Sequence, residues 1–251
     1  MSGEAFSEGR CAPVIYLDSV DSTNTYMKSL AAQGSPHGSL VVARQQTGGR
    51  GRLGRSFVSP PGGLYMSMLW RPQLSPEQAA RLSCAVAIAL CRALEESCGV
   101  SPDIKWPNDL LLGGKKLCGI LSEALWQPDG SFCLIIGCGI NINAESFPGE
   151  LAATATSLYL ETGRRFEPEG LAESIIPRLD GIYDSWGTEG AAFLPEYRRR
   201  CVTPGKDVLI DQAGQRLKVR ALAIDEDYSL RIRWPDGRLE KKSFGEIFPL
   251  V

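Results

Sequence analysis

A short stretch in which glycine alternates with arginine is the part of this 251-residue chain best suited to chemistry. It reads Gly49-Arg50-Gly51-Arg52-Leu53-Gly54-Arg55 and follows an apolar run at residues 40–43. Glycine lets backbone N–H groups approach an anion closely, and arginine adds planar, permanently charged donors that match phosphate or carboxylate. This stretch, the Gly/Arg loop, predicts a site for a phosphorylated or acyl-phosphate species. A solvated basic turn would have the same composition.

Five other segments carry residues that could act together with the Gly/Arg loop. They are Asp21–Asn24, Gln46–Gly48, Lys105–Asp109, Lys115–Glu123 and Gly137–Asn143. Lys116 begins an apolar run, where a lone cation needs a reason, whereas a lysine placed like Lys105 is often only a surface residue. Ser22 and Thr23 offer uncharged hydrogen-bonding groups and are equally suited to cap a helix.

In this order and at these spacings, the segments resemble the biotin–protein ligases, also called biotin–[acetyl-CoA-carboxylase] ligases. The likeness runs from about Val14 to Asn143, and its specific parts are the strings Gln-Thr-x-Gly-Arg-Gly-Arg-x-Gly-Arg and Lys-Trp-Pro-Asn-Asp. The resemblance implies two steps. Biotin first attacks the α-phosphate of ATP, with Mg²⁺, to give biotinyl-5′-adenylate and pyrophosphate. A lysine of an apo biotin carboxyl-carrier protein or carboxylase domain then accepts biotin and releases AMP.

The resemblance also implies a role for each residue. Because two anions must meet in the first step, cationic donors should gather there, and the catalytic set would be Arg50, Arg52 and Lys116. Biotin would be bound by Ser22, Thr23, Asn24, Gln46, Gly49, Arg50, Gly51, Arg52, Lys116, Gly119, Ile120 and Leu121. ATP would be bound by Arg52, Arg55, Phe57, Lys105, Asn108, Lys116 and Asn141. No protein ligand for a metal is assigned.

Three features of this assignment have alternatives. Phe57 stands where the family commonly has a tryptophan that stacks on adenine, so the aromatic face is kept but its area is smaller. Asp109 would help the acceptor lysine lose its proton or would bind metal, and a hairpin-turn aspartate explains it as well. Ile120 and Leu121 would form an apolar wall around biotin, or simply belong to a core strand. In the family the Gly/Arg loop orders over the ligand and shields the adenylate from water.

The elements that must position these residues follow from apolar runs and turn signals. Strands are predicted at 14–17, 40–43, 64–70, 103–106, 110–112, 116–125 and 132–140. A first helix is predicted to begin at one of several possible caps within 18–24 and to end at about residue 32, and further helices are predicted at 76–97, 168–186 and 190–200. Gly113-Gly114 and Pro128-Asp129-Gly130 predict hairpins. These elements predict an α+β fold, in which a mixed or antiparallel sheet is packed with helices. The resemblance implies that the catalytic domain has a class II synthetase-like fold.

The composition changes after Cys201-Val202-Thr203-Pro204-Gly205. Short alternating segments at 207–210, 216–224, 229–234 and 239–243 predict a small C-terminal β-barrel. We therefore expect a catalytic biotin- and ATP-binding domain at 1–202 and a barrel domain at 203–251.

Composition narrows the class of function. A net charge of -2 argues against general nucleic-acid binding. With no membrane-length apolar run and no signal-peptide core, a cytoplasmic location is expected. His37 is the only histidine and follows a proline in a turn, which removes most hydrolase mechanisms. The eight cysteines contain no CxxC pair and are expected to be reduced, mostly buried thiols.

Rival interpretations remain open at this stage. A lipoate–protein ligase has a related fold and also activates its acid as an adenylate. A nucleic-acid-binding module is the other alternative, because it could use an Arg/Gly loop to bind phosphates. Regulatory biotin ligases add an N-terminal DNA-binding domain; with only about thirteen residues before the first predicted strand, this chain is expected to be a short form that does not bind operator DNA. Homodimerisation through the central sheet is a further family expectation.

Overall fold

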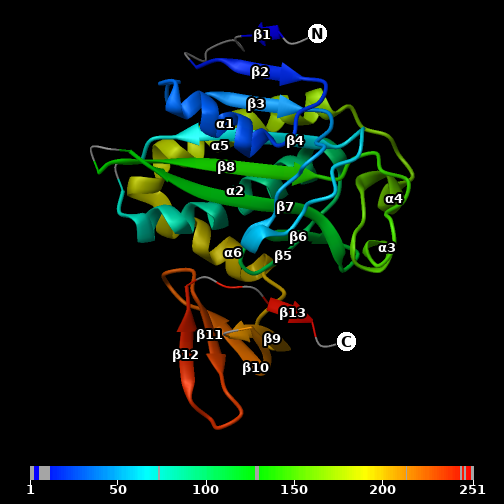
Figure 1. Ribbon diagram of the computed structural model, residues 1–251. Helices are drawn as coiled ribbons and strands as arrows, with labels where there is room; N and C mark the ends of the chain where they lie inside the picture. The colour runs from blue at the N-terminus through cyan, green and yellow to red at the C-terminus, as the bar shows by residue number, and fades with distance from the viewer. Residues whose placement is uncertain are drawn as a thin grey trace.

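The computed structural model describes residues 3–5, 12–72, 74–127, 130–212, 214–243, 245 and 247–249. Two sheets organise these residues (Figure 1). An eight-stranded sheet has the order β1-β2-β3-β4-β8-β7-β6-β5, and a five-stranded sheet has the order β12-β11-β10-β9-β13. The predicted α+β class is confirmed.

The bounds of the elements are as follows. The large sheet comprises β1 (Gly3–Ala5), β2 (Val14–Leu17), β3 (Leu40–Ala43), β4 (Leu64–Trp70), β5 (Asp103–Lys105), β6 (Asp109–Leu112), β7 (Lys115–Trp126) and β8 (Phe132–Ile140). The helices are α1 (Thr23–Ala32), α2 (Pro76–Cys98), α3 (Leu151–Thr154), α4 (Leu158–Thr162), α5 (Pro168–Glu189) and α6 (Leu194–Arg200), with 3-10 turns η1 (Arg52–Gly54) and η2 (Gly190–Phe193). The small sheet comprises β9 (Asp207–Gln212), β10 (Gln215–Ile224), β11 (Leu230–Arg233), β12 (Leu239–Lys242) and β13 (Ile247–Pro249).

The large sheet is mixed because β2 and β3 run parallel, whereas its other pairs are antiparallel. β6 and β7 form the predicted hairpin, with Gly113 and Gly114 at φ values of 58° and 78° that suit glycine. β7 and β8 form the second predicted hairpin, although its turn residues Pro128 and Asp129 lie outside the described residues. The long β7–β8 ladder places Gly119 opposite Gly139.

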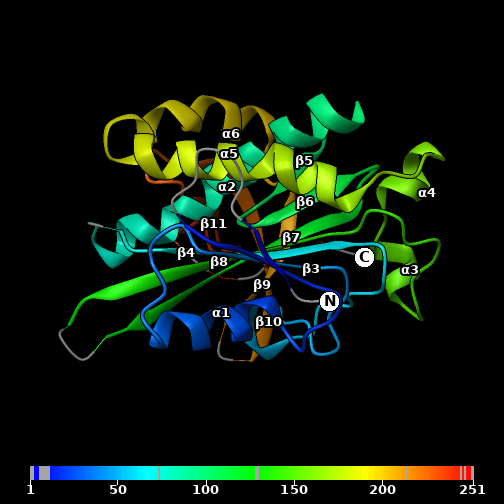
Figure 2. The same ribbon diagram turned by 90° about the horizontal axis from the view of Figure 1, so that it is seen from above.

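Helices cover both faces of the large sheet (Figure 2). α2 and α5 lie on one face over the main apolar core. α1 lies on the other face, where Met27 and Ala31 pack against Val41, Leu69 and other residues of a second cluster. Because both faces are covered, every residue of β4 is buried. Within the described chain, no helix has the length and apolar content needed to cross a membrane.

The predicted helix at 190–200 is divided in the structure. Residues 190–193 form η2, and α6 begins at Leu194 with Pro195 in its first turn. Proline has no backbone N–H to continue a preceding helix but fits the start of a new one. The short helices α3 and α4 and the strands β1 and β13 were not predicted.

The C-terminal strands form an antiparallel sheet. Residues of this C-terminal region contact the segment Lys105–Asp109. The backbone N–H of Trp106 donates to Thr203 Oγ1 at 3.0 Å, and its indole N–H donates to the carbonyl of Tyr228 at 3.0 Å. Tyr197 donates its hydroxyl to the carbonyl of Pro107 at 3.1 Å. The small sheet and α6 therefore fix one wall of the site described below.

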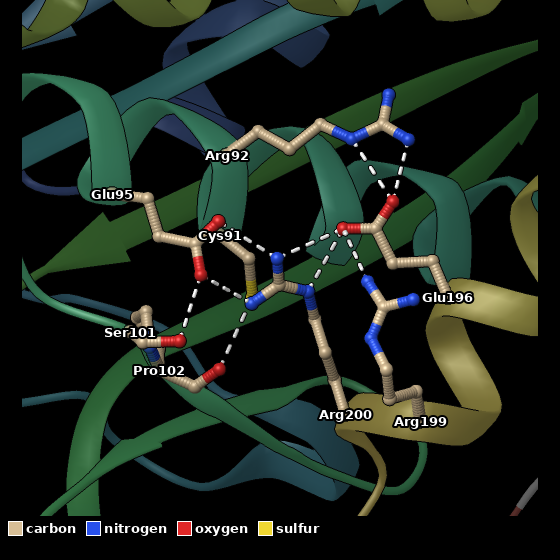
Figure 3. A network of polar contacts seen from close by, with 8 residues as sticks. All are labelled: Cys91, Arg92, Glu95, Ser101, Pro102, Glu196, Arg199 and Arg200. Atoms are coloured by element: carbon tan, nitrogen blue, oxygen red, sulfur yellow. Dashed lines mark hydrogen bonds and ion pairs between the residues drawn. The ribbon is translucent and has the colours of Figure 1, made fainter.

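An ion-pair network joins α6 to α2 at the base of this connection (Figure 3). Arg200 donates to both oxygens of Glu95 at 2.8 and 2.7 Å, and to Glu196 at 2.9 Å. Hydrogen bonds from Arg200 lower the pKa of Glu95. Two residues further on, the N–H of Val202 donates to the carbonyl of Ile104 in β5 at 2.9 Å. The network thus anchors the chain where it crosses from α6 to the small sheet.

The seven described cysteines are buried, unpaired thiols, as predicted. Burial raises the pKa of Cys84, Cys91 and Cys138 to about 12. Because the reactive species is the thiolate, these thiols should stay unreactive at pH 8. We expect none of the seven to be labelled by a thiol reagent in the native protein, and all to be labelled in denaturant. Rapid native labelling of a Cys91 or Cys138 peptide, seen by mass spectrometry, would contradict this burial.

Candidate active site

A cavity of about 270 Å³ opens where the Gly/Arg loop lies beside the Lys105–Asp109 segment and the β7–β8 hairpin. Every predicted site residue except Gly49 and Asn141 lines it. The lining residues to which the sequence assigned no individual role include Ser56, Gly137, Gly139, Leu151 and Ile247. Ile247 belongs to β13, so the small sheet contributes to the cavity wall.

The Gly/Arg loop is folded back on itself. The N–H of Gly51 donates to the carbonyl of Arg55 at 2.7 Å, and the N–H of Phe57 donates to the carbonyl of Gly49 at 2.9 Å. The tip turns through Leu53, whose φ of 53° lies in the left-handed region, and its side chain is 75% exposed. The loop therefore directs its arginines along the cavity while its one large apolar side chain points to solvent.

Gly49 closes the base of this loop and does not line the cavity. A Cβ at this position would lie 2.3 Å from the carbonyl oxygen of Phe57 and 2.5 Å from Ser59 Oγ. No other residue fits without moving the backbone. Its predicted contact with biotin stays a prediction.

Two cations in the cavity are held by neighbours from other elements. Arg52 Nη1 donates to Asn108 Oδ1 at 3.1 Å, and Asn108 in turn donates to the carbonyl of Ile120. Lys116 Nζ lies 2.7 Å from Asp109 Oδ1. Asp109 is the one carboxylate among the described lining residues, where five arginines and lysines gather: Arg50, Arg52, Arg55, Lys105 and Lys116. The cavity is therefore suited to anions.

Glycines make the floor beneath Phe57. A Cβ on Gly139 would lie 2.6 Å from Phe57 Cε1, and one on Gly119 would lie 3.1 Å from Phe57 Cε2. The Phe57 ring therefore rests on this cross-strand glycine pair, and Lys116 Nζ lies 5.6 Å from the ring centroid. Phe57 places an aromatic face inside the cavity, next to the cations.

Uncharged polar groups occupy the end of the cavity nearest α1. Gln46 Oε1 accepts the backbone N–H of Thr23 at 2.9 Å, and Gln46 Nε2 donates to Ser59 Oγ at 2.9 Å. Ser22 is the N-cap of α1, with its side chain accepting from Thr25 at 3.4 Å, and it also lines the cavity. Both roles proposed for Ser22 are therefore compatible with the structure.

Sequence reasoning missed Ser67 and Glu123, which support this polar end. Ser67 in β4 is fully buried and lies 2.6 Å from Asn24 Oδ1. Glu123 in β7 accepts from Asn24 at 2.8 Å and from Lys28 at 2.7 Å. A lone serine inside the apolar run 64–70 and a carboxylate inside the run 116–125 were the available signals.

Gly137 provides a test of how tightly the polar end is packed. A Cβ there would lie 2.1 Å from Asn24 Oδ1, and the Asn24 amide is held on both sides. We expect Gly137→Ala to cost about 1–3 kcal/mol of folding stability, as other overpacked sites do, measured as a lower Tm. Gly181→Ala in α5 is the matched control, because its Cβ meets nothing within 4 Å. Equal Tm values for the two variants would contradict the packing described.

Asn141 and His37 do not line the cavity. Asn141 is buried, and its side-chain N–H donates to the carbonyl of Thr156 at 2.9 Å, while its Oδ1 has no partner among the described residues. Its predicted contact with adenine stays a prediction. His37 is exposed on a loop, as expected, and its Nδ1 accepts the N–H of Arg71 at 3.2 Å.

Comparison with known proteins gives the family of this chain. Residues 16–141 match the Biotin/lipoate A/B protein ligase family. The chain is 33% identical over 230 residues to the biotin–[acetyl-CoA-carboxylase] ligase of Paracoccus denitrificans, covering 88% of this chain and 95% of that relative. This chain therefore belongs to the biotin/lipoate protein ligase family, and the predicted resemblance is confirmed.

Two other comparisons agree. The chain is 39% identical over 180 residues to the bifunctional ligase/repressor BirA of Bacillus spizizenii, covering 70% of this chain but only 55% of that relative. It thus spans about half the length of such bifunctional relatives. The fold matches the biotin protein ligase from Aquifex aeolicus in complex with biotin and ATP, with a TM-score of 0.79, 28% identity and coverage of 94% of this chain and 97% of that one.

Proposed function

We propose that this protein activates biotin with ATP to biotinyl-5′-adenylate and transfers biotin to a lysine of a biotin-dependent carboxylase or carboxyl-carrier domain. The observation that carries the proposal is the cavity itself. Its lining combines five cations, among them Arg52 and Lys116, with the uncharged groups of Thr23 and Gln46. Biotin carries a matching group for each, an anionic carboxylate and an uncharged cyclic urea.

In the first step, the biotin carboxylate oxygen attacks the α-phosphorus of ATP and pyrophosphate leaves. Both partners are anions, so bringing them together is the main electrostatic obstacle. Arg52 and Lys116 come from different elements and are already oriented by Asn108 and Asp109. Such preorganised cations stabilise the developing charge without reorganising during the reaction. Phe57 offers the aromatic face on which we place adenine.

In the second step, the acceptor amine attacks the acyl carbon, forming the amide as the C–O bond to AMP breaks. The amine must lose a proton, and Asp109 is the carboxylate that the described cavity wall provides. The Gly/Arg loop would cover the adenylate meanwhile and keep water from the anhydride.

The residues present fit a Mg²⁺ ion carried mainly by nucleotide phosphates. Such ions are commonly held by one or two carboxylates, substrate phosphates and water. Among the described residues no group of three or more His, Cys, Asp or Glu side chains forms a metal cage, and Asp109 is the carboxylate that lines the cavity. Bound with ATP, the ion would neutralise phosphate charge.

The proposal is tested by a transfer assay. Purified protein, ATP, Mg²⁺, biotin and an apo carboxyl-carrier domain should give a carrier one biotinyl group heavier, with the label on a single lysine by peptide mass spectrometry. Lipoate in place of biotin separates the two branches of the family. Modification with lipoate but not biotin would replace this proposal with lipoate ligation, and no modification by either would reject it.

Three finer expectations accompany the proposal. We place the reaction in the cytoplasm, which the seven buried thiols support. We expect a homodimer built on the central sheet, to be measured by light scattering with and without biotin. We expect no retention on operator DNA in a shift assay at physiological salt, which the net charge of -2 supports.

A further inference from the structure

A row of hydrogen-bonding contacts leads from a carboxylate in β7 to a hydroxyl at the cavity. Glu123 Oε1 accepts from Lys28 Nζ at 2.7 Å, and its Oε2 accepts from Asn24 Nδ2 at 2.8 Å. Asn24 Oδ1 lies 2.6 Å from Ser67 Oγ, and Ser67 Oγ lies 2.8 Å from Thr23 Oγ1. Asn24, Ser67 and Thr23 are buried, so water does not substitute freely for these partners.

The carboxylate determines which way the hydrogens in this row point. Burial works against ionisation of Glu123, but hydrogen bonds from Lys28 and Asn24 outweigh it and lower its pKa. An ionised carboxylate only accepts, so the Asn24 amide must turn its NH₂ toward Glu123 and its carbonyl toward Ser67. That carbonyl also only accepts, so the single hydroxyl hydrogen of Ser67 points to Asn24. Ser67 therefore has no hydrogen left to donate to Thr23. The Thr23 hydroxyl can donate its own hydrogen to Ser67 Oγ at 2.8 Å or to Gln46 Oε1 at 3.1 Å, both of which belong to the protein.

We propose that Glu123 is a positioning residue that acts through Asn24 and Ser67 on the Thr23 hydroxyl. Because of it, the Thr23 hydroxyl donates its hydrogen to the protein, and the Thr23 oxygen stays available as an acceptor for N–H groups of the ligand. Thr23 lines the cavity, and its backbone N–H is already taken by Gln46 Oε1 at 2.9 Å. The polar end would thus select a ligand with urea-type N–H donors over a carboxylic acid that lacks them. This inference rests on the proposed function and adds what makes the site specific.

Glu123→Gln should reverse the direction of hydrogen donation along this row while leaving the side chains in the same positions. The Lys28 ammonium only donates, so the Gln carbonyl would face Lys28 and its NH₂ would face Asn24. Asn24 would then turn its carbonyl to the Gln and its NH₂ to Ser67. Ser67 would have to donate to Thr23, while the Thr23 hydroxyl would keep Gln46 Oε1 as an acceptor. The Thr23 oxygen would then already accept from Ser67 and would be a poorer acceptor for the N–H groups of the ligand.

The test is calorimetric titration of the full chain with biotin in the absence of ATP. We expect Glu123→Gln to raise the Kd for biotin by about 10- to 100-fold, the range for hydrogen bonds that involve charged groups. Ser67→Ala should have a similar effect, and it keeps the test usable if Glu123→Gln folds poorly. The double variant should bind no more weakly than the weaker single variant, because both changes break one row. In turnover assays KM for biotin should rise while kcat and KM for ATP stay near the wild-type values.

Lys28→Met is the matched control. It removes the ion pair, whose partners are partly exposed, but leaves Glu123 to accept from Asn24, so the Kd for biotin should stay within about twofold of wild type. Wild-type affinity in Glu123→Gln, additive losses in the double variant, or a parallel rise of KM for ATP would overturn the inference. Wild-type protein that does not bind biotin would instead reject the proposed function itself.

Discussion

Replacing Arg52 with alanine is expected to slow formation of the biotin adenylate by about 100- to 1000-fold, the usual effect of removing one preorganised donor from a charged transition state. Arg52 of the Gly/Arg loop donates a hydrogen bond across the cavity to Asn108 at 3.1 Å. Its loss removes both a cation and the link between the loop and the Lys105–Asp109 segment. The measurement is pyrophosphate release in the presence of biotin and ATP.

Two further variants sharpen this prediction. Leu53→Ala changes the neighbouring residue in the same loop, but Leu53 is exposed and does not line the cavity, so its rate should match wild type. Arg52→Lys keeps the charge but not the planar fork of donors and should have an intermediate rate. A wild-type rate in Arg52→Ala would remove Arg52 from the site.

Lys116→Met should lower adenylate formation by about 100-fold or more. Lys116 lies beside Asp109 and near the Phe57 ring, so its loss removes a cation and also leaves the Asp109 carboxylate to repel the anionic substrates. Stability should change little, because the Lys116 side chain is 35% exposed. The rate is measured as for Arg52, with thermal unfolding run in parallel.

The neighbouring lysine supplies the control for this change. Lys115 begins β7, is exposed and does not line the cavity. Lys115→Met should therefore retain the wild-type rate although it removes the same charge from the same hairpin. Equal losses in the two variants would show that overall charge, rather than the position of Lys116, accounts for the effect.

The large sheet could be predicted closely where apolar runs end at strong turn signals. The predicted bounds of β2, β3, β4 and β8 agree with the structure, because glycine, proline and polar residues flank each run. The missed elements are short. The four and five residues of α3 and α4 are too few to show helical periodicity, and β13 gains its place only by pairing with β9.

The candidate site, too, could be predicted only in part. The Gly/Arg loop and the Lys105–Asp109 segment could be predicted because their combinations of residue types are distinctive within the sequence itself. The contribution of Ser67 could not, because it depends on strand register, which places Ser67 opposite Gly137 and leaves room there for Asn24. The glycine floor beneath Phe57 likewise arises only when β7 and β8 pair.

Exchange of labelled pyrophosphate into ATP tests the central claim most directly, because it reports the reversible first step and needs no acceptor protein. We expect the wild-type protein to catalyse exchange that requires both biotin and Mg²⁺, and Arg52→Ala to lose nearly all of it. Exchange that proceeds equally without biotin, or that survives in Arg52→Ala, would contradict the assignment of this cavity as the place where biotin is activated.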